Sequence, residues 1–184
     1  AEEADVVVAV GTRLQDFTTG SWSVFGNEQM RLIAINAARY DAHKHRALSV
    51  VGDALAGIEE LGQALEGWKA PDPWISKSRS LYAEWNTTVE QHSGPTTDVP
   101  PSYAHVIGAV NRVCDETDLA LTAAGGFPGE LCKNWKTKSS GTFDCEFGFS
   151  CMGYEIAGGW GAKMADPDRD VIVFVGDGSY MMMN

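Results

Sequence analysis

Residues 171–184 read VIVFVGDGSYMMMN, an unbroken apolar run followed by Gly-Asp-Gly-Ser. Five apolar residues without polar alternation are typical of a strand buried on both faces of a parallel sheet. Open α/β sheets bind ligands at the carboxyl edge, where this strand would end. Gly176 and Gly178 would let backbone N–H groups approach a phosphate, and Asp177 would offer an oxygen ligand to Mg²⁺. The stretch therefore predicts a parallel sheet with a site for a phosphorylated, metal-bound ligand.

Two other interpretations of this stretch are an ordinary turn and a calcium-binding loop. Gly-Asp-Gly also occurs in ordinary turns, and the tetrapeptide alone leaves that alternative open. A calcium-binding EF-hand loop is excluded, because Met181 would stand at position five and no glycine follows at position six. The alternating carboxylates of residues 166–170 lack the required glycine as well, and we interpret them as a solvated turn.

Charge and composition exclude several classes of partner. The 184 residues contain 14 Lys and Arg against 25 Asp and Glu, a net charge of −11. Such a chain is not expected to bind a nucleic acid or an anionic membrane surface. No apolar run approaches the roughly 20 residues that span a bilayer, and the acidic N-terminus does not resemble a signal peptide. We therefore predict a cytoplasmic protein whose phosphate site relies on backbone amides, helix ends and a metal.

The cysteines and histidines do not form a recognisable metal site. Cys114, Cys132, Cys145 and Cys151 form no CxxC pair and have no histidine at zinc-ligand spacing. They are interpreted as reduced, mostly structural thiols. The segment 43–45 (HKH) is interpreted as a polar loop.

The region before the decisive stretch predicts further elements of an α/β unit. Ser102 can cap a helix with an apolar face through Cys114, and residues 119–122 form a short buried strand. Further on, Met152, Ile156, Trp160 and Met164 recur every four residues along a predicted helix. Gly158, Gly159 and Gly161 in that helix indicate very close packing against a sheet or a cofactor.

The first third of the chain predicts a second α/β unit. Residues 5–10, 31–36 and 47–51 read as strands, and Asp53 can cap a helix that runs to about Leu65. In that helix Leu55, Ile58, Leu61 and Leu65 are predicted to face inward. Proline-containing breaks enclose a connecting helix at about 74–91. The fold class predicted is α/β, with two partial three-layer parallel-sheet (Rossmann-like) units, 1–66 and 102–184, joined by a linker with a helix at 67–101.

Segments in both units resemble, in the right order, the thiamine-diphosphate-dependent enzymes. Residues 5–66, with their VGTR, IN and VVGDA motifs, resemble the second half of that family's middle domain. Residues 102–184 resemble the start of its diphosphate-binding domain, through AGGFPGEL at 124–131, GFSCMGY at 148–154 and GDGS at 176–179. The resemblance implies thiamine diphosphate and Mg²⁺ as cofactors.

The resemblance also implies roles for individual residues. Asp177 matches the Mg²⁺ ligand. The residues that match diphosphate contacts are Gly176, Gly178 and Ser179, with Gly126, Phe127 and Pro128 lining the diphosphate by their backbone. Met152 matches the apolar residue that holds the cofactor bent, with core packing as the alternative. The Ser150 carbonyl matches the acceptor for the pyrimidine amine, with an ordinary loop as the alternative. Glu130 is either a substrate-side acid or base or a surface residue, and the catalytic residues stay unknown.

The same motifs imply a narrower activity. The segments GFPGEL, FGFSCMGYEIAGGWGAKMA and GDGSYMMMN resemble members that hydrolyse a carbon–carbon bond in a polyhydroxylated cyclic 1,2-dione in inositol catabolism. The alternatives are a synthase or decarboxylase acting on 2-oxo acids, and a non-catalytic structural α/β fragment. A nucleotide or flavin at the middle domain is a further possibility, although no G-x-G-x-x-G motif is present. We expect an internal piece of a longer protein, inactive by itself, that is a homodimer or homotetramer when full length.

Overall fold

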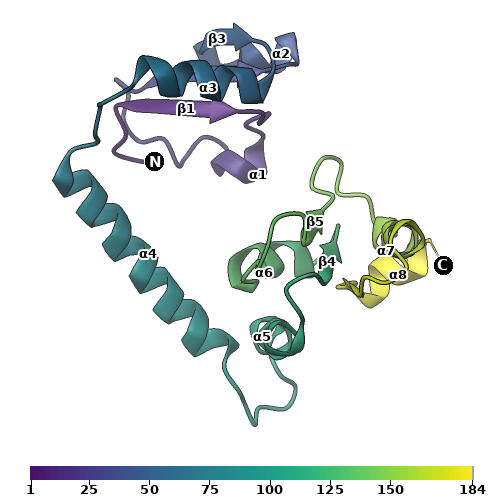
Figure 1. Cartoon of the computed structure of the whole chain (residues 1–184). Coiled ribbons are helices and arrows are strands. Elements are labelled where there is room, and N and C mark those ends of the chain that lie inside the picture. The colour runs from purple at the N-terminus through teal and green to yellow at the C-terminus, as the bar shows by residue number, and fades with distance from the viewer. Residues whose placement is uncertain (184) are drawn as a thin grey trace. The chain divides into compact units, whose positions relative to one another are not determined.

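The computed structural model describes residues 1–183, which form two compact units, Ala1–Ala70 and one that begins at Pro71 (Figure 1). Each unit is built around a three-stranded parallel sheet with helices on its faces. The predicted fold class, α/β with two parallel-sheet units, is therefore confirmed. Among residues 1–183, no helix is long and apolar enough to cross a membrane.

The sheet of the first unit has the strand order β1-β2-β3. Its strands are β1 (Val6–Val10), β2 (Arg31–Asn36) and β3 (Leu48–Val51), within a residue of the predicted ones. The helical segments are α1 (Asp16–Thr19), α2 (Arg39–Ala42), the 3₁₀ turn Lys44–Arg46 and α3 (Ala54–Ala64). Helix α3 begins as predicted, with the Asp53 carboxylate accepting a hydrogen bond from the Ala56 N–H at 3.0 Å.

The prediction that the apolar side chains of α3 face inward is wrong in the part of the chain that the structure describes. Leu55 and Ile58 are 65% and 51% exposed, Leu65 is exposed as well, and only Leu61 is half-buried. The helix instead approaches the sheet through Gly57, where an added Cβ would lie 2.7 Å from Cγ2 of Ile35. A glycine allows this close approach, so α3 contacts β2 at a residue without a side chain.

The sheet of the second unit has the order β5-β4-β6. Its strands are β4 (Leu119–Thr122), β5 (Phe143–Cys145) and β6 (Val171–Val173). All four residues of β4 are buried, whereas those of β6 are half-buried, because no further strand pairs with β6 within residues 1–183. The expectation that the strand at 171 is buried on both faces is therefore wrong for β6. It is β4 that has this burial pattern.

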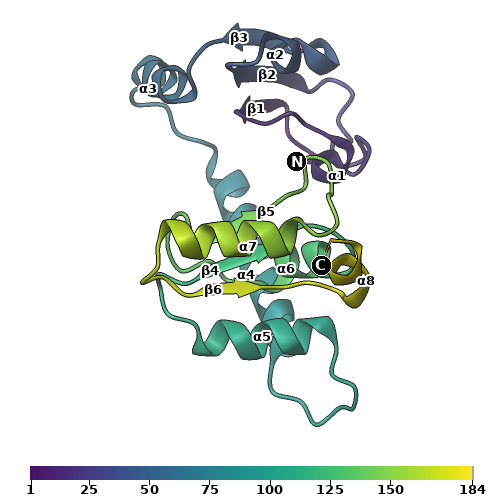
Figure 2. The same cartoon turned by 90° about the vertical axis from the view of Figure 1, so that its right-hand side faces the viewer.

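Helices accompany this sheet (Figure 2). They are α4 (Asp72–Ser93), α5 (Tyr103–Val113), α6 (Phe127–Asn134), α7 (Tyr154–Ala165) and α8 (Asp177–Met182). Helix α4 contains the predicted connecting helix and packs on α5 and α6. Ser102 caps α5 as predicted, and its hydroxyl accepts a hydrogen bond from the His105 N–H at 3.3 Å.

The two faces of β4 contact different helices. Ala120 belongs to a buried cluster with Ile107 of α5 and Leu131 of α6, which Phe174 completes. On the other face, an added Cβ at Gly158 of α7 would lie 3.4 Å from Cδ1 of Leu121. Successive strand residues point to opposite faces, so the sheet is a middle layer with α5 and α6 on one side and α7 on the other.

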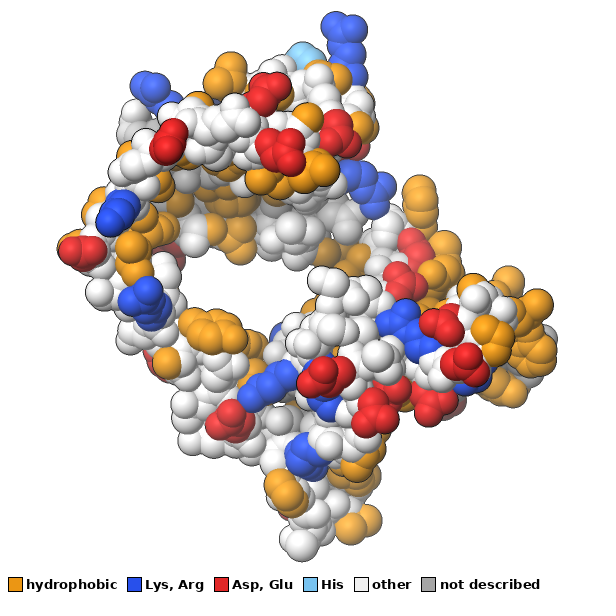
Figure 3. Space-filling model, viewed as in Figure 1, with side chains coloured by type: hydrophobic (Ala, Val, Ile, Leu, Met, Phe, Trp, Pro, Cys, Tyr) orange, Lys and Arg blue, Asp and Glu red, His pale blue; other side chains and the backbone are white. Residues whose placement is uncertain are grey.

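Gly158 and Gly159 of α7 lie close to the sheet, as predicted, whereas an added Cβ at Gly161 would meet no atom within 4 Å. An added Cβ at Gly159 would lie 2.5 Å from Cγ2 of Val173. In contrast, Trp160 is 71% exposed and Met164 is also exposed. Apolar side chains therefore gather on the surface over α7 and α8, at the right of Figure 3, where Met181, Met182 and Met183 are exposed as well.

Candidate functional site

Three segments of the second unit follow its three parallel strands. Residues 123–128 follow β4, residues 146–153 follow β5, and residues 174–179 follow β6. Because the carboxyl ends of parallel strands meet at one edge of a sheet, these segments lie at the same edge (Figure 2). All the predicted cofactor and metal residues belong to them.

Asp177 is the first residue of α8 and is exposed. One of its carboxylate oxygens, Oδ1, accepts a hydrogen bond from the Gly178 N–H at 2.8 Å. Added Cβ atoms at Gly176 and Gly178 would meet no atom within 4 Å, so there is open space at both residues that flank Asp177. An exposed hard oxygen donor between two such residues fits a Mg²⁺ ligand. Within residues 1–183 no group of three or more metal-binding side chains is found, so other ligands would have to come from phosphate oxygens, water or groups outside these residues.

The first segment can offer only its backbone to a ligand. Pro128 is fully buried, and the Phe127 ring packs on Tyr103 and Phe174 with centroid distances of 4.7 and 5.7 Å. Gly126 is exposed, and an added Cβ there would lie 3.0 Å from the Tyr103 hydroxyl oxygen. The side chains thus belong to the core, as a backbone role for Gly126, Phe127 and Pro128 requires. That role stays a prediction.

The second segment is held by Glu146. Its two carboxylate oxygens accept hydrogen bonds from the N–H groups of Phe149 and Cys151, both at 2.8 Å. These N–H groups stabilise the ionised form and hold the pKa of Glu146 below its usual value. Between them Ser150 has a φ of +54°, an uncommon left-handed conformation for a residue other than glycine. The carboxylate of Glu146 therefore fixes the loop that carries the Ser150 carbonyl.

Met152 lies at the end of the same segment. It is 46% exposed and is not in the hydrophobic core of the unit. Its side chain is therefore available at the edge of the sheet, as a role in holding the cofactor requires. In the alternative interpretation of Met152, as a core residue, it would be buried.

The third segment contains an unexpected feature at Ser179. This residue is buried, and its hydroxyl donates a hydrogen bond to Oε2 of Glu155 at 3.0 Å. The same hydroxyl oxygen accepts a hydrogen bond from the Gly153 N–H at 3.0 Å. The Ser179 side chain is thus engaged within the protein, so a diphosphate contact at this position would come from its backbone.

Sequence reasoning missed Glu155. It is 0% exposed, and it accepts hydrogen bonds from Ala124, Gly153 and Ser179. The available signal was a single carboxylate in the otherwise uncharged stretch 147–162. Charged residues are almost never fully buried unless they have partners, so an acidic residue in such a stretch indicates partners elsewhere in the chain.

Glu130 has partners of its own on α6. One carboxylate oxygen lies 3.0 Å from Nζ of Lys133, and the other accepts a hydrogen bond from the Asn134 side-chain amide at 3.2 Å. These contacts match the surface alternative for Glu130 better than a role as a free acid or base.

The four cysteines are free thiols that differ in exposure. Cys114 is buried, Cys145 is half-buried, and Cys132 and Cys151 are exposed. The Cys132 sulfur accepts a hydrogen bond from the Cys145 thiol, which lowers the pKa of Cys132 to about 7. The same contact raises the pKa of Cys145, because it stabilises the protonated thiol.

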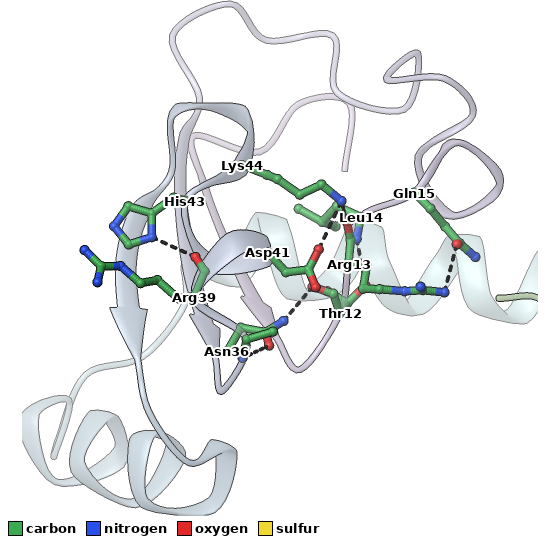
Figure 4. A network of polar contacts seen from close by, with 10 residues as sticks. Thr12, Arg13, Leu14, Gln15, Asn36, Arg39, Asp41, His43 and Lys44 are labelled. Atoms are coloured by element: carbon green, nitrogen blue, oxygen red, sulfur yellow. Dashed lines mark hydrogen bonds and ion pairs between the residues drawn. The ribbon is translucent and has the colours of Figure 1, made fainter.

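The carboxyl edge of the first unit carries a separate polar network (Figure 4). The Asn36 amide donates to the Thr12 carbonyl at 3.0 Å, and Lys44 donates to the Arg13 carbonyl at 3.0 Å and to Asp41 at 3.1 Å. His43 contacts the Arg39 carbonyl at 2.8 Å. These groups connect the loops after β1 and β2 to one another. Residues 43–45, interpreted as a polar loop, lie at the end of α2 and in the 3₁₀ turn Lys44–Arg46.

Comparison with known families finds two matches in this chain. Residues 1–61 match the central domain of thiamine pyrophosphate enzymes, and residues 123–184 match their C-terminal, thiamine-pyrophosphate-binding domain. The second match contains all three segments of the site. Thiamine pyrophosphate is the same compound as thiamine diphosphate.

Individual relatives share one name. Proteins named 3D-(3,5/4)-trihydroxycyclohexane-1,2-dione hydrolase from Bacillus cereus AH820, Bacillus anthracis CDC 684 and Bacillus thuringiensis Al Hakam are each 36% identical over 208 aligned positions. The alignment covers 100% of this chain and 32% of each relative. The chain thus spans about a third of the length of these relatives.

Proposed function

Because the chain belongs to the thiamine pyrophosphate enzymes and carries parts of their central and C-terminal domains, we propose that its second unit binds the diphosphate of thiamine diphosphate together with Mg²⁺. The observation that carries this proposal is the meeting of three loop segments at one sheet edge, with the exposed Asp177 flanked by two glycines that have open space. Because the chain has a net charge of −11, we expect carboxylate oxygens to bind the metal and backbone amides to bind the phosphate, instead of a basic patch.

Each segment has a distinct task in this proposal. Asp177 would hold Mg²⁺, and the backbone of residues 126–128 and 176–179 would contact the diphosphate. The Ser150 carbonyl would accept a hydrogen bond from the pyrimidine amine, and Met152 would support the bent cofactor. When bound, the cofactor supplies the stabilisation of a carbanion, while the protein binds, orients and shields it.

For the full-length protein we propose the hydrolysis of a carbon–carbon bond in trihydroxycyclohexane-1,2-dione. The support is the 36% identity to hydrolases of that name across the whole of this chain. The alternative within the family is a synthase or decarboxylase acting on 2-oxo acids. Incubation of the full-length enzyme with each substrate class, followed by mass spectrometry of the products, separates the two.

We further propose that the full-length protein is a cytoplasmic homodimer or homotetramer. The exposed apolar side chains over α7 and α8, such as Trp160 and Met164, support association with another protein surface. Since the 184 residues span about a third of their relatives, we expect them to bind the cofactor weakly, or not at all, when isolated.

The test of the cofactor site is the replacement Asp177→Ala in the full-length enzyme, with Asp168→Ala as the control. Both carboxylates are exposed, but Asp168 lies in the turn between α7 and β6. Calorimetric titration with thiamine diphosphate and Mg²⁺ should show an affinity at least about tenfold lower for Asp177→Ala and unchanged for Asp168→Ala. Equal affinities in both variants would mean that Gly-Asp-Gly is only a turn.

A further inference from the structure

Glu155 is a buried carboxylate that accepts hydrogen bonds from three parts of the second unit. Oε1 accepts from the Ala124 N–H, and Oε2 accepts from the Gly153 N–H and the Ser179 hydroxyl, all at 3.0 Å. A carboxylate has only acceptor oxygens, and here both of them have donors. No ion pair to Glu155 occurs among the described residues, so its charge is balanced by N–H and O–H dipoles alone.

The three donors lie in the three segments of the proposed cofactor site. Ala124 directly precedes Gly125 and Gly126 in the segment after β4. Gly153 follows Met152 in the segment after β5, and Ser179 follows Gly178 in the segment after β6. One side chain on the first turn of α7 therefore connects all three loops.

The contact between the second and third segments is especially close. The Gly153 N–H points to both Oε2 of Glu155 and Oγ of Ser179, each at 3.0 Å. Gly153 has a φ of +91°, and a Cβ there would overlap the Met183 side chain. The segments before α7 and at the start of α8 thus pack directly on one another, with the Glu155 carboxylate beside their contact.

Burial of a charge does not by itself favour folding. Removing a carboxylate from water costs several kcal/mol even after the protein relaxes, and well-packed apolar residues often stabilise a core equally well. A carboxylate differs from an apolar residue in that it fixes its donors at defined positions. Its location between the three loops therefore points to a role in their geometry.

We propose that Glu155 is a positioning residue that sets the relative placement of the three loops that hold the diphosphate and the metal. It acts through Ala124, Gly153 and Ser179 and does not touch the cofactor. This inference rests on the proposed function of the second unit. In this proposal the buried hydroxyl of Ser179 binds the Glu155 carboxylate, and phosphate contacts at Ser179 come from the backbone.

The test is Glu155→Gln in the full-length enzyme, with the exposed Glu90→Gln as the control. Glu90 forms an ion pair with Lys136 and lies on α4. Glutamine keeps one acceptor oxygen but, in either orientation of its amide, places an NH₂ group against at least one of the three donors. We expect the Kd for thiamine diphosphate, measured by calorimetry with Mg²⁺, to rise about tenfold or more, as for outer residues that orient ligands.

A purely structural role of Glu155 predicts a lower thermal stability of Glu155→Gln with an unchanged cofactor Kd. A positioning role instead predicts that Glu155→Gln loses more activity at low thiamine diphosphate than at saturating thiamine diphosphate, because the loss lies in cofactor binding. The Glu90→Gln enzyme should match the parent in every measurement. An unchanged cofactor Kd in a folded Glu155→Gln enzyme would overturn the proposal, whatever its thermal stability.

A second variant keeps the test decisive if Glu155→Gln does not fold. Ser179→Ala removes one of the three donors and leaves the carboxylate in place. It should raise the cofactor Kd by itself, and an unchanged Kd would overturn the proposal. If both variants fold, the double variant should bind no more weakly than Glu155→Gln, because Ser179 acts through Glu155. Additive losses would instead place the Ser179 hydroxyl on the phosphate and overturn the proposal.

The parent enzyme separates this inference from the function on which it rests. If the full-length parent does not bind thiamine diphosphate with Mg²⁺, the proposed function fails. If the parent binds and Glu155→Gln binds equally well, only the positioning role fails.

Discussion

The hydroxyl of Ser179 donates a hydrogen bond of 3.0 Å to the carboxylate of Glu155, 24 residues earlier in the chain. Both side chains are buried, and the same hydroxyl accepts a hydrogen bond from the Gly153 N–H. In a motif expected to bind phosphate, this serine side chain is therefore occupied by the protein. The contact gives Ser179 a role in stability that its sequence motif does not suggest.

We predict that Ser179→Ala lowers the free energy of unfolding by about 1–3 kcal/mol, because it leaves buried polar groups with fewer partners. The measurement is urea unfolding of the full-length protein without cofactor. Ser139→Ala is the matched control, since the Ser139 hydroxyl also donates one hydrogen bond, to the Glu116 carbonyl, but is exposed. The control should change the free energy by less than about 0.5 kcal/mol. Equal effects of the two substitutions would contradict the prediction.

Two glycines of α7 should respond in opposite ways to replacement by alanine. A Cβ at Gly159 would lie 2.5 Å from Cγ2 of Val173, whereas a Cβ at Gly161 meets no atom within 4 Å. Gly159→Ala should destabilise by about 1–3 kcal/mol through overpacking, less the gain in helix propensity. Gly161→Ala should stabilise by up to about 1 kcal/mol through that propensity alone. Denaturation midpoints of the two variants provide the comparison, and stabilisation by both would mean that α7 does not press on β6.

The loop around Ser150 should loosen at acid pH. Its N–H groups at Phe149 and Cys151 hold the pKa of Glu146 below the ordinary value of 4.5. The contribution of Glu146 to folding is therefore complete above the ordinary pKa, and it disappears as the pH falls through the lowered one. Hydrogen exchange at the Phe149 and Cys151 amides, corrected for the intrinsic pH dependence, should show this loss of protection. Glu146→Gln should exchange faster at neutral pH and show no such acid step.

The thiol of Cys132 should react with iodoacetamide near neutral pH. Its pKa is about 7, because the Cys145 thiol donates a hydrogen bond to its sulfur. The thiolate is the reactive form, so the alkylation rate should rise with pH around a midpoint near 7. In Cys145→Ala the midpoint should move up towards the ordinary value of 9.0. Mass spectrometry of the Cys132 peptide follows the reaction, and an unmoved midpoint would show that Cys145 is not the cause.

Most strands could be predicted because their sequences carry a strong local signal. The runs at 6–10, 31–36, 48–51 and 119–122 are rich in Val, Ile, Leu and Ala and end at polar residues or glycines. Strand β5 was not predicted, since Phe143–Cys145 has only three residues with Asp144 in the middle, too short to show a period. The apolar face of α3 misled the prediction, because periodicity shows which side chains are apolar and not which surface covers them.

The site was predictable in its location and not in its internal connections. Asp177 could be placed at a strand end because the apolar run and the glycines around it are contiguous in sequence. Two of the three partners of Glu155 are distant in sequence, Ala124 31 residues before it and Ser179 24 residues after it. Only the folded sheet brings those segments together, and no spacing rule in the sequence indicates such a pairing.

The unequal exposure of the four thiols also offers a practical means of observing the site. Cys132 on α6 and Cys151 before α7 are exposed, while Cys114 is buried and Cys145 is half-buried. Maleimide dyes would therefore attach first at one position beside the first loop of the site and one position within the second. Energy transfer between a donor and an acceptor at these positions would report the separation of the loops in solution. Within these 184 residues, the two exposed native thiols thus provide attachment points for a distance measurement across the site.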